Sequence, residues 1–403
     1  MAPVRRTAGN AVHSSTMDEE DEDALDLADQ TQRPNDVAVQ QQRVNAWHPV
    51  LDPEWMICTF LILSVILIPV GFKMQSLSDD VVEMKRIYDS ASEGDVAPED
   101  RACRIGMDYN STNECTLEFI APKDMTPPIL IHYELDNFHQ NHRSYSRNRD
   151  DFQLTGIERD DVFSDECKPL LKLGDIDLNP CGLIANTFFH DIFELEPGVS
   201  ANGEPLVMKE EGIAWQSDIK HRFDFALGFK MEECPQDDCN EGASSTCCQD
   251  LDFSCDKPLI SPKDGKCYAF HYPDEDTTQY LYETYPEKIS PLEHVTNEHF
   301  IVWMRVATLP NFRKLYGYIQ EPIAAGTVLR FNVKTRYVVE SFDGYKALVI
   351  STNNIFGGQN EYLGTSFYGV GVFCLAMGLL FGLKHWLRPR KLANKKYLRY
   401  KEH

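Results

Sequence analysis

Cysteine is the residue type whose number and placement most clearly predict chemistry in this sequence of 403 residues. Two of the twelve cysteines, Cys58 and Cys374, lie in long apolar stretches, and the other ten fall between residues 103 and 267. Confinement to one segment is typical of a domain in an oxidising compartment, where thiols pair as disulfides. The ten are Cys103, Cys115, Cys167, Cys181, Cys234, Cys239, Cys247, Cys248, Cys255 and Cys267. We expect all ten to form disulfides.

Local spacing suggests some of the pairs. Cys103 and Cys115 are twelve residues apart, and Cys167 and Cys181 are fourteen apart, so each pair is expected to close one short loop. Such a loop contributes roughly 3 kcal/mol by restricting the unfolded chain. The six cysteines from Cys234 onward lack the C-x-x-C spacing of zinc ribbons, so we expect three disulfides there rather than a metal. Their pairing stays open, because spacing alone does not decide it.

Other residues that could do chemistry give weaker signals. Asp136, His139 and His142 lie together in DNFHQNH, but without H-E-x-x-H spacing we expect polar loop packing rather than a metal site. The sequence contains no G-x-S-x-G elbow, phosphate-binding loop or G-x-G-x-x-G motif. We therefore expect a protein that is not an enzyme and has no cofactor. Asn110 begins the single N-x-[ST] sequence and is expected to carry a glycan outside the cytosol.

Two uncharged apolar stretches flank the segment that contains the ten cysteines and Asn110. Trp55 to Phe72 has 18 residues and Tyr362 to Leu383 has 22. As helices they would be roughly 27 and 33 Å long, close to the roughly 30 Å hydrocarbon core of a bilayer. The first begins too late for an ordinary signal peptide, so we expect two membrane spans. The last twenty residues carry eight Lys or Arg against one Glu, which predicts that both termini are cytosolic.

The spans divide the chain into segments of different composition. The formal net charge is −24, and the part between the spans carries that whole excess, which argues against binding to nucleic acid or electrostatic docking on anionic lipid. Residues 18–23 are all acidic, in a region too poor in apolar residues to order itself. The expected segments are an acidic tail at 1–40, a juxtamembrane piece at 41–54, spans at 55–72 and 362–383, an exterior domain at 73–361 and a basic tail at 384–403.

The exterior domain is predicted to be mainly β. Apolar and polar residues alternate from Val328 to Val339, which is typical of a half-buried strand. Asp343-Gly344 and the apolar run Tyr345 to Ile350 follow, so we expect a hairpin with a tight turn. Other expected elements are strands over Ile129–Leu135 and Ile301–Ala307 and short helices over Asn311–Ile319 and around Ile184–Leu195. The predicted fold is an antiparallel β-sandwich, tied by disulfides, between two membrane helices.

The second apolar stretch carries a stripe of glycines. At 100° per residue, Gly364, Gly371, Gly378 and Gly382 fall within about 40° of one another. Small residues along one face let a second membrane helix approach closely. We therefore expect a packing face, whose occupant is either the chain's own first helix or a helix of a partner.

Several longer blocks resemble one known family. They are FHQNHRSYSRNRDDFQLTG from Phe138, PCGLIANTFFHD from Pro180, GIAWQSD from Gly212 and FIVWMRVATLPNFRKLY from Phe300. In these blocks and their order, the sequence resembles the Cdc-fifty/Lem-three family, the non-catalytic β subunits of type-four P-type ATPase phospholipid flippases. The six-cysteine stretch and the single glycosylation site depart from the family pattern.

The resemblance implies a function that the residues alone do not. A member of the family binds one catalytic flippase chain, is needed for that chain to leave the endoplasmic reticulum, and supports its transport cycle. It implies a β-sandwich exterior, paired cysteines at Cys167 with Cys181 and at Cys103 with Cys115, and a place in the endoplasmic reticulum, Golgi, endosomal or plasma membrane. The alternative is a subunit of a two-helix ligand-gated ion channel, which would form homotrimers.

Overall fold

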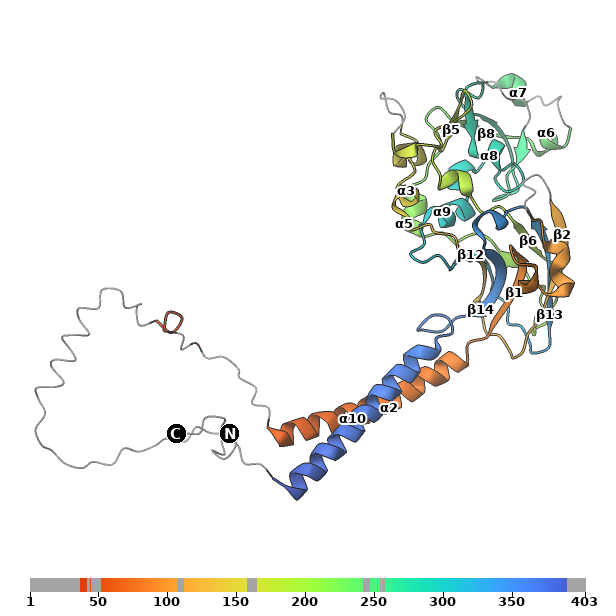
Figure 1. The fold of residues 1–403 in the computed structure, drawn as a ribbon. Coiled ribbons are helices and arrows are strands. Elements are labelled where there is room, and N and C mark those ends of the chain that lie inside the picture. Colours follow the sequence, from red (N-terminus) through yellow and green to blue (C-terminus); the bar gives the residue numbers. More distant parts are fainter. Residues whose placement is uncertain are drawn as a thin grey trace, which may run out of the picture. The chain divides into compact units, whose positions relative to one another are not determined.

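A computed structural model gives the fold (Figure 1). It describes residues 37–41, 44, 52–106, 112–157, 165–241, 247–251, 253, 255 and 258–389. The expected glycan at Asn110 and nearly all of the two tails lie outside the described residues. The chain divides into two compact units, one of Met1–Ile62 with Leu375–His403 and one of Leu63–Cys374.

Two helices of 27 residues each are long and apolar enough to cross a membrane. They are α2 (Pro53–Asp79) and α10 (Glu361–Leu387). Both extend beyond the uncharged stretches, because helical backbone continues into polar residues such as Lys73 and Lys384 at their ends. The expectation of two membrane-spanning helices in an integral membrane protein is confirmed.

The larger sheet has five antiparallel strands in the order β1-β14-β3-β12-β7. Their bounds are β1 Glu83–Ser90, β14 Tyr345–Thr352, β3 Ile129–Leu135, β12 Phe312–Ile319 and β7 Met208–Lys209. The order shows that the first strand after α2 pairs directly with the last strand before α10. The two ends of the domain between the helices are therefore joined by a ladder of backbone hydrogen bonds, with one register shift between Ile87 and Asp89.

A second antiparallel sheet packs against the first. It has the order β2 (Asn113–Ile120), β13 (Val328–Thr335) and β6 (Ile192–Leu195). Phe193 of β6 makes edge-to-face contacts with two rings of the larger sheet, Tyr88 of β1 and Tyr316 of β12. The buried cluster also joins Phe331 of β13 to Ile131 of β3. The predicted antiparallel β-sandwich with disulfides is confirmed.

The predicted hairpin is wrong. β13 and β14 lie in different sheets and do not pair with each other. Between them a 3₁₀ turn (Glu340–Phe342) leads to Asp343, whose φ is +54°, and to Gly344, where a Cβ would lie 2.2 Å from the carbonyl oxygen of Asp136. The Asp-Gly pair therefore carries the chain across the sandwich under close backbone contact, and an Asp-Gly turn rule cannot distinguish such a crossing from a hairpin.

Two further predicted elements were wrong, because the expected strand is a helix and the expected helix is a strand. Ile301–Ala307 was expected to be a strand, but α9 (Glu298–Met304) occupies most of it and begins at Asn297, whose side chain accepts hydrogen bonds from two backbone N–H groups of the first turn. Asn311–Ile319 was expected to be helical, but it forms β12. Both segments are short and mix buried with exposed positions, and in such short apolar runs periodicity does not separate helix from strand.

The segment around Ile184–Leu195 is likewise not a helix; it contains a 3₁₀ turn (Ala185–Thr187) and then β6. Two small three-stranded sheets lie outside the sandwich, β8-β10-β9 and β11-β5-β4. Their bounds are β8 Lys230–Cys234, β10 Cys267–His271, β9 Leu259–Ile260, β11 Thr278–Tyr280, β5 Ile176–Asn179 and β4 Lys172–Leu173. The remaining short helices are α3 Arg143–Ser146, α4 Asp151–Leu154, α5 Gln216–His221, α6 Gln236–Glu241, α7 Cys247–Asp250 and α8 Leu281–Thr284.

Candidate interaction site: the helix pair and the disulfide-bonded domain

Glycines bring the backbones of α2 and α10 into contact. A Cβ at Gly71 would lie 2.5 Å from the backbone nitrogen of Tyr368, and one at Gly364 would lie 2.7 Å from that of Gln75. One at Gly371 would lie 2.8 Å from Cγ1 of Ile68. These separations are shorter than real Cβ contacts, so no side chain fits at these three positions without a shift of the helices.

Contact is looser toward the other end of the pair. A Cβ at Gly378 would lie 3.0 Å from Leu61, and one at Gly382 would lie at an ordinary 3.9 Å from Ile57. The ring of Phe60 lies 5.8 Å from that of Phe381. Of the two occupants that the sequence left open for the glycine face, the structure has the chain's own first helix.

Sequence reasoning missed Gly71, the glycine that makes the shortest contact between the two helices. It lies on α2, and a single glycine in an apolar stretch produces no periodicity that would mark a face. Gly369 gives the converse case, because a Cβ there would meet nothing within 4 Å. A glycine therefore contributes to helix packing only where it faces the other helix, as Gly71 does and Gly369 does not.

Much of the remaining helix surface is apolar and exposed. On α2 the exposed large side chains are Trp55, Ile62, Leu63, Val65, Ile66, Val70 and Phe72. On α10 they include Tyr368, Val370, Val372, Phe373, Leu375, Leu379, Leu380, Leu383 and Trp386. In a membrane these side chains are free to contact lipid or the helices of another protein.

Hydrogen bonds fix the end of α2 to the exterior domain within the larger unit. The side-chain amide of Asn354 donates to the carbonyl of Leu77 at 2.8 Å, and the ammonium of Lys123 donates to the carbonyl of Asp79 at 3.1 Å. The backbone N–H of Asn360 donates to the hydroxyl of Ser78 at 2.9 Å. The first two bonds satisfy carbonyls that a helix end leaves without partners, and the third holds the start of α10 beside the end of α2.

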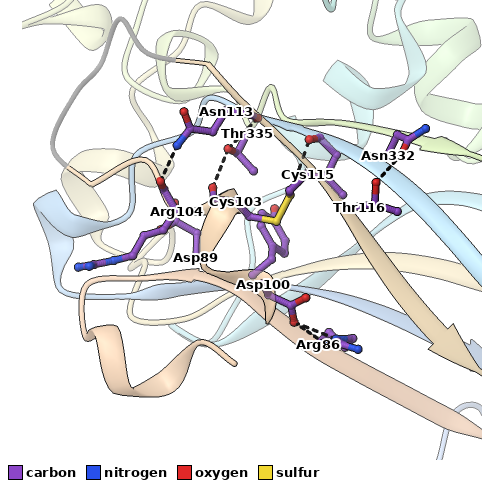
Figure 2. Close-up of a disulfide and its surroundings, with 12 residues drawn as sticks. Arg86, Asp89, Asp100, Cys103, Arg104, Asn113, Cys115, Thr116, Asn332 and Thr335 are labelled. Carbon is purple, nitrogen blue, oxygen red and sulfur yellow. Dashed lines mark hydrogen bonds and ion pairs between the residues drawn. A yellow bond between two sulfur atoms is a disulfide. The ribbon is translucent and has the colours of Figure 1, made fainter. Parts of the chain in front are cut away.

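The first disulfide ties a surface turn to the smaller sheet. Cys103, at the end of the 3₁₀ helix Pro98–Cys103, bonds to Cys115 of β2 (Figure 2). Thr335 of β13 donates to the Cys103 carbonyl at 2.7 Å, and Arg86 of β1 pairs with Asp100 of the same turn at 2.7 Å. The turn thus bridges the edges of both sheets.

The other eight cysteines also pair. Cys167 bonds to Cys181, as their spacing suggests. The six later cysteines, whose pairing the sequence left open, form three bonds: Cys234 to Cys247, Cys239 to Cys267 and Cys248 to Cys255. Cys234 and Cys267 face each other across the β8-β10 ladder but bond to other partners, so the bonds staple α6 and α7 to this small sheet.

The residues of the DNFHQNH segment are not brought together. His139 faces the carbonyl of Asn137, His142 faces the hydroxyl of Ser144, and Asp136 accepts a hydrogen bond from Asn311. Within the described ranges, no group of three or more His, Cys, Asp or Glu side chains could hold a metal ion. These three polar side chains bond separately to the loops around them, while Phe138 of the same segment packs against the aromatic core.

A buried charge cluster holds the core of the sandwich. The ammonium of Lys346 on β14 is fully buried, 2.8 Å from Asp191 and 3.3 Å from Asp89, and it donates to the carbonyl of Tyr337. Asp191 also accepts from the hydroxyl of Tyr88 at 2.8 Å, and burial raises the pKa of that tyrosine well above its usual range. No spacing pattern marks this cluster in the sequence, because its members come from distant segments.

A second charged group lines a cavity of about 960 Å³ beside the larger sheet. Glu210 lies 2.7 Å from Nε2 of His299 and 3.7 Å from the ammonium of Lys288. Burial lowers the pKa of His299 to about 4 and that of Lys288 to about 8. The wall combines charged side chains of both signs with apolar ones such as Leu259 and Ile289.

The fold, disulfides and helix pair agree with the matches to known proteins. A family model described as the LEM3 (ligand-effect modulator 3) family / CDC50 family matches residues 74–391. "ALA-interacting subunit 3" of Arabidopsis thaliana is 34% identical over 370 residues, covering 91% of this chain and 90% of that protein. "Cell cycle control protein 50A" of Bos taurus is 31% identical over 87% of this chain and 88% of that protein.

A fungal relative extends the similarity to the whole chain. "Phospholipid-transporting ATPase accessory subunit CDC50" of Chaetomium thermophilum is 26% identical over 445 aligned residues, covering 100% of this chain and 98% of that protein. The name of this relative describes an accessory role, which agrees with the non-catalytic role that the family resemblance implied. By these matches, with the two membrane helices and the disulfide-bonded sandwich, the chain belongs to the CDC50/LEM3 family.

Proposed function

We propose that this chain is the accessory subunit of a phospholipid-transporting P-type ATPase. The observation that carries the proposal is the family match over residues 74–391, together with the Chaetomium thermophilum relative, whose name describes that function. The subunit neither hydrolyses ATP nor moves lipid itself. It binds one catalytic chain, supports its exit from the endoplasmic reticulum and supports its transport cycle.

Two surfaces would meet the catalytic chain. The glycine face of α10 is filled by α2, so the exposed apolar side chains of the pair, such as Phe373 and Leu380, are those left for its membrane helices. The exterior domain would lie over the outer loops of the pump, with both termini of the subunit in the cytosol. Its disulfides and the buried Lys346 cluster support the role of a rigid contact surface.

Affinity purification tests the proposal. The tagged chain is isolated from its native membrane in mild detergent, and the mass of the complex is measured. We expect a one-to-one complex with a P-type ATPase chain, together with reduced phospholipid translocation in cells that lack the subunit. Recovery of no such ATPase, with unchanged translocation, contradicts the proposal. A homotrimer of this chain would instead support the ion-channel alternative.

A further inference from the structure

The loop between β14 and α10 ends in a small hairpin that carries two apolar side chains. The backbones of Asn354 and Gly357 exchange two hydrogen bonds of 3.0 Å, and the Asn354 side chain accepts from the N–H of Phe356 at 2.8 Å. Gly357 has a φ of +101°, a conformation that glycine adopts without strain. The tip, Ile355 and Phe356, is therefore held in a defined shape by the backbone around it.

The tip projects away from the protein. Ile355 is 93% exposed and Phe356 is 55% exposed, although both are among the residue types that are usually buried. Residues 353–360 (NNIFGGQN) contain no charge, in an exterior domain that is otherwise strongly acidic. Neighbouring apolar residues on an uncharged, preformed tip are typical of a contact with an apolar environment.

The ends of the loop fix its depth beside the membrane helices. Asn354 and Asn360 bond to Leu77 and Ser78 in the last turns of α2, at 2.8 and 2.9 Å. α10 begins at Glu361, and the next residue, Tyr362, is 83% exposed. In Figure 1 the loop lies where β14 passes into α10. Since a spanning helix crosses the lipid–water interface near its ends, and aromatic residues concentrate there, the hairpin lies at the level of the interface.

We propose that the Ile355–Phe356 tip inserts into the lipid interface on the side of the exterior domain. The occupant is lipid because the tip lies at the level where the two helices, whose large apolar side chains are exposed, leave the bilayer, and because the uncharged loop needs no oppositely charged partner. The tip thereby fixes the depth and tilt at which the exterior domain stands on the membrane. This inference depends on the membrane helices and not on the identity of the partner.

A fluorescent label measures the depth of the tip. In a background of Cys58→Ala and Cys374→Ala, Ile355→Cys is labelled with an environment-sensitive NBD group in the full chain, reconstituted without partner into phosphatidylcholine nanodiscs. The matched control is Leu309→Cys, at a side chain that is 67% exposed in the segment between α9 and β12. Quenching is measured with iodide in the water and with doxyl groups on the lipid chains.

We expect the label at 355 to emit at shorter wavelength, to be quenched by doxyl lipid and to lose quenching by iodide. The label at 309 should show the opposite pattern. Adding Phe356→Asp to Ile355→Cys should restore iodide quenching, which excludes insertion driven by the label itself. Equal behaviour at 355 and 309 overturns the proposal. It is also overturned if the 355 label is protected from iodide only after a P-type ATPase is bound, because the tip would then contact protein.

Discussion

Alanine at Gly364 should separate the membrane helices, whereas alanine at Gly369, one and a half turns away on the same helix, should not. A Cβ at Gly364 would lie 2.7 Å from the backbone nitrogen and 2.8 Å from the Cα of Gln75. Backbone atoms cannot rotate aside as a flexible side chain would, so the helices must move apart by several tenths of an ångström. A Cβ at Gly369 meets no atom within 4 Å.

The two substitutions share their effect on helix propensity. Replacing glycine by alanine in a helix is worth up to about 1 kcal/mol in favour of the helix at either position. Overpacking at Gly364 costs about 1–3 kcal/mol against this gain. The free energy of the packed pair should therefore differ between the two variants by about 1–3 kcal/mol, with Gly364→Ala the less stable.

Cross-linking reports on the helix pair without interference from the exterior domain. The rings of Phe72 and Tyr368 lie 4.7 Å apart, so Phe72→Cys and Tyr368→Cys, in a background without Cys58 and Cys374, should be joined rapidly in lipid by a short bifunctional thiol reagent. Gly364→Ala should slow the reaction and Gly369→Ala should leave its rate unchanged. Equal rates in the two alanine variants would refute the conclusion that the backbones are in contact at Gly364.

Three further outcomes are expected. Lys346→Met leaves Asp191 buried without its cation and should lower the free energy of unfolding in denaturant by about 3–5 kcal/mol; Lys334→Met, in an exposed pair, should cost no more than about 1 kcal/mol. Burial lowers the pKa of His294 to about 3, so its stabilising effect is complete above pH 6.5 and is lost as pH falls toward 3; thermal unfolding from pH 7 to 4 should show a flatter dependence for His294→Phe. Asn110→Gln should remove one glycosidase-sensitive step in gel mobility, and an unchanged mobility would contradict an exterior location.

Local features of the sequence predicted the membrane helices and the disulfide-bonded domain. A run of uncharged apolar residues needs no tertiary information to be recognised, and cysteines confined to one segment predicted the disulfides that the structure has. Strand pairing is different. The alternation in β13 identified a strand correctly, but its neighbours β2 and β6 come from far earlier in the chain, and the adjacent β14 joins the other sheet. Sequence proximity favoured a hairpin that the three-dimensional arrangement does not form.

The candidate site was likewise predictable where it depends on local sequence and not where it depends on distant segments. Helical periodicity identified the glycine face of α10, but it could not say which helix covers that face or that Gly71 contributes from the other side. Lys346 is the stronger example. Its position in an apolar strand looks like a solvent-facing lysine at a sheet surface, and only the approach of Asp89 and Asp191 from other segments explains why it is buried. Such long-range charge pairing leaves no spacing pattern in the sequence.

The connections at the ends of the exterior domain indicate how a non-catalytic subunit could influence a pump. β1 follows α2 within a few residues and pairs along its length with β14, from which the chain returns to α10. The helices are locked by backbone contact at Gly71 and Gly364, and hydrogen bonds join the end of α2 to the loop before α10. Within the larger unit, these hydrogen bonds and backbone contacts therefore couple the ends of both helices to the sheet. A catalytic chain that bound both the helices and the sheet would therefore meet two coupled surfaces, and we expect the subunit to favour those states of the pump that fit both surfaces at once.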